Sequence, residues 1–139
     1  MAATSVHLKL DELIETDFIP LKSFGTVKSM VDAFNVSNKY VYTVVDNENN
    51  LLGVIYLENV KYLLFDQELH DKIKIIDITD QSIISIDCHE SMDSAMKKFE
   101  ETKLWSIPVT DGTQYIGFIS RANIFSYYRR KLKQTVSMF

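Results

Sequence analysis

Two stretches of the chain, 65 residues apart, carry the same order of apolar and polar positions. Residues 18–46 align without a gap with residues 83–111. In each stretch a short apolar run comes first, and apolar residues then recur at i, i+3, i+4 and i+7. This pattern predicts a strand followed by an amphipathic helix, with Thr26 and Ser91 as the N-caps. The helical positions are Val27, Met30, Val31 and Phe34 in the first copy and Met92, Ala95, Met96 and Phe99 in the second.

Each predicted helix is followed by a predicted β-hairpin and a second helix. In the first copy residues 41–45 and 51–57 are the strands, and the polar run DNENN forms the turn. In the second copy SIPVT and YIGFIS are the strands, and DGTQ forms the turn. The second helices are expected at about residues 58–66 and 121–133.

Each copy therefore reads as strand, helix, strand, strand, helix. One copy buries too little surface to be very stable alone, whereas two packed copies share a core. We expect an α+β fold of two β-α-β-β-α repeats packed as a pseudo-two-fold pair. The expected parts are a lead-in segment at 1–16, repeat 1 at 17–66, a linker at 67–80, repeat 2 at 81–133 and a C-terminal tail at 134–139.

The composition argues against several classes of protein. The net charge of −4 does not suit a general nucleic-acid binder, which needs a basic surface. Cys88 is the single cysteine, so an intrachain disulfide is excluded and a reducing compartment is favoured. The N-terminal residues lack the apolar stretch of a signal peptide, and no run reaches the roughly 18 apolar residues of a membrane span. We expect this fragment to be soluble.

The repeated pattern resembles the CBS domain, a family that occurs as tandem pairs. The resemblance depends on the order of elements, on the Val-Val-Asp or Val-Thr-Asp end of the second strand, and on two corner segments. These corners are GVIYLEN at residues 53–59 and GFISRAN at residues 117–123. The resemblance runs from Asp17 to Leu132 and implies a sensor of adenine nucleotides, with the ligand in the cleft between the two repeats.

A narrower resemblance concerns the protein to which the chain belongs. The segments LIETDFIPL, LENVKYLLFDQELHDKIKIIDI and MKKFEETKLWSIPVTDGTQYIGFISRANIFSYYRRKLK look like the cytoplasmic tail of bacterial CLC-type chloride channels and transporters, particularly from the Bacteroides group. This resemblance implies a place on the cytoplasmic face of the inner membrane, with the transmembrane part of the same protein as a partner.

In the CBS family a Gly-apolar-apolar-Ser/Thr-x-x-Asp motif meets the ribose and phosphate side of the nucleotide. Carried over by position, the motif places Ser120 and Asn123 in the better of two clefts. The same cleft takes Tyr40 and Val41 from the other copy, and Arg121 is placed to reach a phosphate. ATP, ADP and AMP are the candidate regulatory ligands, and no cofactor is required.

This sequence departs from the family motif in both copies. Asn123 stands where Asp is expected, and Asn forms hydrogen bonds but brings no charge. In the first copy Tyr56 replaces the hydroxyl residue and Asn59 replaces the Asp. The weaker cleft combines these two residues with Trp105 and Ser106.

A purely structural role for the same residues is an open alternative. Ser120 is then the N-cap of the last helix, and Asn123 supports its first turn. Tyr56 and Trp105 are then aromatic residues of the core or its rim.

No catalytic or metal site is expected. His7, His70 and His89 are scattered and lack ligand-like spacing to Cys88. The segment DCHE at residues 87–90 contains four potential ligands, but adjacent residues at a strand end are expected to point in different directions. A Gly-rich phosphate loop is also absent from the sequence, so we do not expect an enzyme.

The second helices carry more apolar positions than one intramolecular contact needs, which indicates a partner surface. By resemblance to CBS pairs, we expect a two-fold homodimer through these helices. The interface residues expected are Val60, Leu63, Leu64, Ile124, Tyr127 and Tyr128. The basic run YYRRKLK either complements the dipole of its own helix or contacts acidic headgroups.

The leading hypothesis is a non-catalytic regulatory module of a chloride channel or transporter, dimeric and responsive to adenine nucleotides. One alternative is a structural dimerisation module without a ligand. Another is a regulatory appendage of a soluble enzyme.

Overall fold

The strands of the two repeats pair in the same way. The computed structural model describes residues 10–137 and contains, among these residues, two three-stranded sheets. The first strand of each sheet runs parallel to the second, and the second neighbours the third. The strands are β1 (Leu21–Lys22), β2 (Val41–Val45) and β3 (Leu51–Tyr56) in one sheet, and β4 (Ile86–Asp87), β5 (Ser106–Asp111) and β6 (Gln114–Ser120) in the other. The expected α+β class and both hairpins are confirmed.

The strand register keeps the sequence offset of 65 residues. Leu21 of β1 pairs with Val44 of β2, and Ile86 of β4 pairs with Val109 of β5. All four side chains are buried, which is why apolar residues recur at these positions.

The first helix of each repeat begins and ends at equivalent positions. These helices are α2 (Val27–Ser37) and α4 (Met92–Thr102). Each ends in a left-handed residue, Asn38 at φ 53° and Lys103 at φ 58°, whose N–H bonds back to the last turn. Ser91 caps α4 as predicted, since its side chain accepts from the N–H of Ser94. The side-chain cap predicted for Thr26 is wrong: its side chain forms no capping bond.

The second helices differ between the repeats. Repeat 2 has the long α5 (Arg121–Ser137), close to the prediction. The single helix expected at 58–66 is instead α3 (Leu57–Val60) followed by the 3₁₀ turn η2 (Lys61–Phe65). The reason is local: the backbone leaves the helical region at Val60, with φ −127° and ψ 13°, and Val60 and Leu63 are buried at 3₁₀ spacing.

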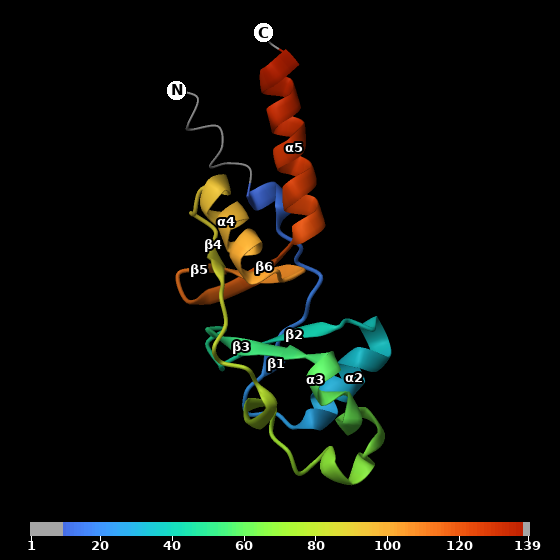
Figure 1. Cartoon of the computed structure of the whole chain (residues 1–139). Helices are drawn as coiled ribbons and strands as arrows, with labels where there is room; N and C mark the ends of the chain where they lie inside the picture. The colour runs from blue at the N-terminus through green and yellow to red at the C-terminus, as the bar shows by residue number, and fades with distance from the viewer. Residues whose placement is uncertain (1–9, 138–139) are drawn as a thin grey trace. The chain divides into compact units, whose positions relative to one another are not determined.

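The chain forms two compact units, each built around one repeat. The repeat 1 unit comprises residues 18–83 and 113–115, and the repeat 2 unit comprises described residues 10–17, 84–112 and 116–137. Figure 1 shows α4 and α5 against the β4–β5–β6 sheet, and α2 and α3 against the β1–β2–β3 sheet. Each unit has its own apolar core.

The segment that precedes each repeat belongs to the unit of the other repeat. The 3₁₀ turn η1 (Asp11–Leu13) lies in the repeat 2 unit, with the preceding Leu10 fully buried in its core. The 3₁₀ turn η4 (Ile75–Ile78) lies in the repeat 1 unit, where Ile75 is also fully buried. A further 3₁₀ turn, η3 (Gln67–Leu69), precedes it in the same unit. The repeat therefore extends beyond the two hairpins to these lead-in segments.

A glycine in each hairpin accommodates the lead-in segment. Glu15 bonds in antiparallel fashion to Phe118, and Asp80 bonds in the same way to Val54. The residues just before these partners are Gly117 and Gly53. At both positions a Cβ atom would overlap the backbone oxygen of the bridging residue. The paired glycines seen in the sequence are thus explained by close backbone approach.

Candidate functional site

The corner between β6 and α5 is organised by Ser120. Its hydroxyl oxygen accepts a hydrogen bond from the backbone N–H of Asn123 at 3.1 Å. Ser120 is therefore an N-cap, and the capping interpretation of this residue is confirmed. Because an O–H group donates as well as accepts, the capping bond leaves the hydroxyl proton able to donate to another acceptor. The Asn123 side chain is exposed at the same corner.

Trp105 lies beside this corner within the same unit. The backbone N–H of Arg121 donates to the carbonyl oxygen of Trp105 at 2.7 Å, so the start of α5 is fastened to the start of β5. Trp105 is 71% exposed, whereas the next residue, Ser106, is buried. The exposed aromatic residue Trp105 is therefore joined through its backbone to Arg121, the residue after Ser120, and an exposed ring of this kind suits stacking of a flat apolar ring.

The guanidinium group of Arg121 is directed to the end of α4. Its Nε donates to the carbonyl oxygen of Leu104 at 2.8 Å, and a terminal nitrogen donates to that of Phe99. The group also lies 5.4 Å from the ring centre of Phe125 and 5.9 Å from that of Trp105. These bonds use two of the five N–H donors of the group and hold it against the end of α4. The sequence offered no signal for this capping role.

The repeat 1 unit has the equivalent corner with different side chains. The N–H of Leu57 donates to the carbonyl oxygen of Tyr40 at 2.9 Å, and Val41 pairs with Tyr56 across the hairpin. Tyr40 is 51% exposed, so both repeats present an aromatic ring at this position. Val41 is buried, and Asn59 is exposed. Burial, with the charges of Asp80 and Tyr40, raises the pKa of the half-buried Tyr56 phenol.

The structure thus brings the candidate residues together in two sets, one in each unit. Ser120, Arg121 and Asn123 lie with Trp105 and Ser106. Tyr56 and Asn59 lie in the unit of Tyr40 and Val41. The two clefts expected from the sequence each combine residues of both units, and that pairing stays a prediction.

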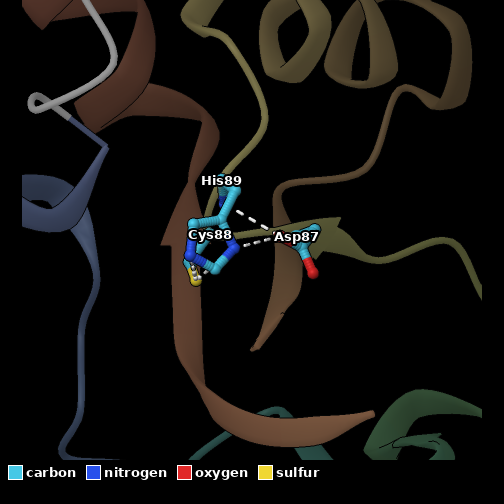
Figure 2. Close-up of side chains that lie close together, drawn as sticks. All are labelled: Asp87, Cys88 and His89. Carbon is cyan, nitrogen blue, oxygen red and sulfur yellow. Dashed lines mark hydrogen bonds and ion pairs between the residues drawn. The ribbon is translucent and has the colours of Figure 1, made fainter. Parts of the chain in front are cut away.

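Sequence reasoning missed a second group of polar side chains in the repeat 2 unit. Asp87, Cys88 and His89 were expected to point in different directions, and this is wrong. Their ligand atoms lie within 4.8 Å of one another. Figure 2 shows the three side chains close together. His89 Nδ1 is 2.9 Å from a carboxylate oxygen of Asp87 and 3.6 Å from the Cys88 sulfur. An oxygen of Asp111 is 3.9 Å from the same nitrogen.

A turn of the backbone causes this convergence. The N–H of Cys88 donates to Thr110, which holds the chain in line with β5. The Asp87 carboxylate then accepts from the N–H of His89 at 2.9 Å and from that of Gly112 at 3.0 Å. The chain folds back at Asp87 in an Asx turn, so the side chain of His89 returns over that of Asp87.

The contacts around this turn shift the pKa values of Asp87 and Cys88. The hydrogen bonds from the N–H groups of His89 and Gly112 lower the pKa of Asp87. Burial and the neighbouring carboxylates of Asp111, Asp87 and Asp11 raise the pKa of the Cys88 thiol.

Comparison with known proteins identifies relatives of this repeated fold. Residues 75–130 match the family model of the CBS domain. The structure is similar to that of CBSX2 in complex with AMP, with a TM-score of 0.68 and 19% identity over 86% of this chain and 94% of that one. It is also similar to CbpB in complex with c-di-AMP, with a TM-score of 0.73 and 17% identity over 98% and 94% of the two chains.

The chain has the fold of a CBS domain pair.

Two further likenesses connect the CBS pair to longer proteins. The soluble part of a magnesium transporter has a TM-score of 0.72 and 23% identity over 86% of this chain and 46% of that one. A homoserine O-acetyltransferase of Methanococcus vannielii is 25% identical over 116 residues, which are 83% of this chain and 24% of that protein. The chain thus spans about a quarter of this curated relative. Among the residues described, no helix is both long and apolar enough to cross a bilayer.

The positions expected to form a dimer interface are mostly core positions of the CBS pair. Val60, Leu63, Ile124 and Tyr127 are buried in the cores of their own units. Their apolar side chains face the sheet of the same unit, so the expectation of a free apolar strip is wrong for these four residues. Leu64 and Tyr128 are partly buried. Among the side chains of these segments whose exposure the structure describes, Tyr62, Phe65 and Leu132 are large, apolar and exposed.

A groove of the repeat 1 unit lies away from its corner. It has a volume of about 460 Å³ and lies between α2 and the turns η2 and η3, lined by Phe34, Phe65 and His70 among others. Of the candidate nucleotide residues in the described part of the chain, none lines this groove.

Proposed function

We propose that this CBS pair is a non-catalytic regulatory module that binds an adenine nucleotide at the β6–α5 corner of repeat 2. The observation that carries the proposal is the exposed residue Trp105, whose backbone carbonyl accepts from the Arg121 N–H at the corner of Ser120 and Asn123. CBSX2 and CbpB, which share the fold, are in complex with AMP and c-di-AMP. Because both of these ligands contain adenine, they support the proposal that this chain also binds an adenine nucleotide.

The polar groups of the corner suit the sugar of a nucleotide. The Ser120 hydroxyl retains its proton for donation, and the exposed Asn123 amide offers both an acceptor and a donor. Neither group is charged, so the ribose is held by neutral hydrogen bonds, which are weaker than those to a carboxylate. We therefore expect modest affinity.

Calorimetry on the full chain with AMP, ADP and ATP tests this proposal. Saturable binding that weakens in Asn123→Ala supports it, and no heat at millimolar nucleotide contradicts it. Two further variants identify the aromatic partner. A loss of affinity in Trp105→Ala places the base on the ring of the same repeat. A loss in Tyr40→Ala instead supports the cleft expected from the sequence, which combines Ser120 with the other repeat.

We also propose that the module regulates a membrane transport protein, the CLC-type chloride channel or transporter that the sequence resembles. The likeness to the soluble part of a magnesium transporter supports a transporter setting. The likeness to a homoserine O-acetyltransferase favours the alternative, an appendage of a soluble enzyme. The coding sequence next to this segment distinguishes them, because a transporter requires several hydrophobic spans and an enzyme does not.

The homodimer remains part of the proposal, with a changed contact surface. The apolar side chains of the second helical segments proposed for a partner contact include the partly buried Leu64 and Tyr128 and the exposed Tyr62, Phe65 and Leu132. Light scattering after size exclusion tests it: a mass of twice 16.1 kDa supports the dimer, and the mass of one chain contradicts it.

A further inference from the structure

The cluster of Asp87, Cys88, His89 and Asp111 has the composition of a transition-metal site. It offers one thiol, one imidazole and two carboxylates, and these are the donor types that bind Zn²⁺ in proteins. Magnesium and calcium prefer all-oxygen sites, so the sulfur and nitrogen donors select against them. We propose that this cluster binds one zinc ion, or a similar divalent transition metal, within repeat 2.

The spacing of the Cys88 and His89 donor atoms fits a single ion, which would replace the 2.9 Å hydrogen bond between His89 Nδ1 and Asp87. Bonds of 2.3 Å to sulfur and 2.0–2.1 Å to nitrogen at the tetrahedral angle place these two atoms about 3.6 Å apart. The Cys88 sulfur lies 3.6 Å from His89 Nδ1. The ligand atoms of Asp87, Cys88 and His89 all lie within 4.8 Å of one another, as expected for atoms that share one ion. An oxygen of Asp111 lies 3.9 Å from the same nitrogen but is not one of this group of three, so a water molecule or a shifted Asp111 completes the fourth position.

The groups around the proposed site favour binding of a cation. Two carboxylates, those of Asp87 and Asp111, lie 2.9 Å and 3.9 Å from His89 Nδ1, beside the Cys88 sulfur. Repulsion among these groups and a thiolate is relieved when a divalent cation lies between them. The His89 side chain is 77% exposed, so an ion can enter from solvent. Asp87 is held in place by the N–H groups of His89 and Gly112, which orient it without occupying every lone pair.

Repeat 1 supplies an internal comparison for the same backbone. At an offset of 65, Asp87, Cys88 and His89 correspond to Lys22, Ser23 and Phe24. The N–H of Ser23 donates to Val45 at 2.9 Å, as that of Cys88 donates to Thr110 at 2.8 Å. The turn therefore folds without any of these three donors, and a lysine replaces the aspartate. The donor set is a feature of repeat 2 beyond what the fold requires.

The comparison also provides the variant that tests the site. Cys88→Ser with His89→Phe gives repeat 2 the pair that repeat 1 carries on the same turn, so we expect this double variant to fold. Zinc titration of the untagged full chain by calorimetry should show one ion per chain. The double variant should bind at least about 100-fold more weakly, since loss of outer-shell partners alone lowers affinity 10–100-fold. The control Asp93→Asn, an exposed carboxylate on α4, should bind as the parent does.

The single cysteine provides an independent readout. One equivalent of zinc should protect Cys88 from iodoacetamide, and magnesium at the same concentration should not. Cobalt should give a thiolate-to-metal charge-transfer band that is absent from the double variant. The proposal is overturned if the double variant binds zinc as tightly as the parent, if no stoichiometric binding is seen, or if one ion is bound by two chains. Circular dichroism of the metal-free double variant confirms that it is folded.

Discussion

The hydroxyl of Ser120 accepts the backbone N–H of Asn123, 3.1 Å away, so the serine of the expected nucleotide motif is also the N-cap of α5. Ser120→Ala should therefore destabilise the chain by about 1 kcal/mol without any ligand. Ser120→Thr, which keeps the hydroxyl, should lose less. Urea unfolding measures both, with Ser126→Ala on the exposed face of α5 as the control. Equal stability of Ser120→Ala and the parent would show that the cap does not matter.

Substitution of Arg121 distinguishes a role in stability from a role in phosphate binding. Arg121→Met keeps the apolar stem but removes the bonds to the carbonyl oxygens of Phe99 and Leu104. Because charged donors are involved and the group is partly exposed, we expect a loss of about 1–2 kcal/mol. The control is Arg129→Met, an exposed arginine further along α5. If Arg121→Met is as stable as the parent but loses AMP affinity, the arginine binds phosphate instead.

The two hairpin glycines should be intolerant of a side chain. The new Cβ in Gly53→Ala overlaps the backbone oxygen of Asp80, and that in Gly117→Ala overlaps the backbone oxygen of Glu15. Neither oxygen can move away without breaking the backbone hydrogen bonds of its β-bridge. Each variant should lose about 1–3 kcal/mol, as overpacked sites do. Gly112→Asn is the matched control, because its Cβ position is open and Asn tolerates φ +64°. Thermal unfolding compares them, and a neutral Gly117→Ala would contradict the close approach.

The sequence predicted the parts of the fold that depend on local pattern. Both hairpins, both first helices and the long α5 follow from apolar periodicity and the repeat itself. The sequence did not predict that α3 ends at Val60, because the continuation at Leu63 is fixed by burial and by the bond of its carbonyl to His70. It likewise did not show that each lead-in segment packs with the other repeat, because that pairing is a long-range contact.

Site prediction was limited for a similar reason. The motif identified Ser120 and Asn123, but the neighbour Trp105 was assigned to the other cleft, because strand adjacency within a unit is not visible in a motif. The segment of Asp87, Cys88 and His89 was not expected to bind a metal, because adjacent residues of a strand point in different directions. The chain leaves the strand direction in an Asx turn. The Asp87 carboxylate stabilises this turn by accepting hydrogen bonds from the N–H groups of His89 and Gly112.

The first hairpin turn should show a carboxyl group with unusual acidity. The Asn50 side chain, and then the N–H groups of Asn50 and Glu48, lower the pKa of Asp46 below its ordinary value. The folded state therefore gains stability from the ionised group above the ordinary pKa of aspartate, and loses it as the pH falls through the lowered value. An NMR titration should show this low midpoint, and Asn50→Ala should raise it more than Lys22→Met does. An unchanged midpoint in Asn50→Ala would contradict the assignment.

Restoring the family carboxylate should strengthen the nucleotide site. In Asn123→Asp the corner gains a charged acceptor for ribose hydroxyls, and charge-assisted hydrogen bonds are roughly twice as strong as neutral ones. We expect AMP affinity to rise about tenfold. The control Asn59→Asp makes the same change at the repeat 1 corner, where Tyr56 replaces the hydroxyl residue. A gain only in Asn59→Asp would move the site to repeat 1.

The most direct test of nucleotide binding is a calorimetric titration of AMP into the full chain and its Asn123→Ala variant. If the corner of Ser120, Asn123 and Trp105 holds the nucleotide, the parent binds saturably and the variant binds about tenfold more weakly or worse. An absence of heat at millimolar AMP, or the same affinity in both proteins, would contradict it.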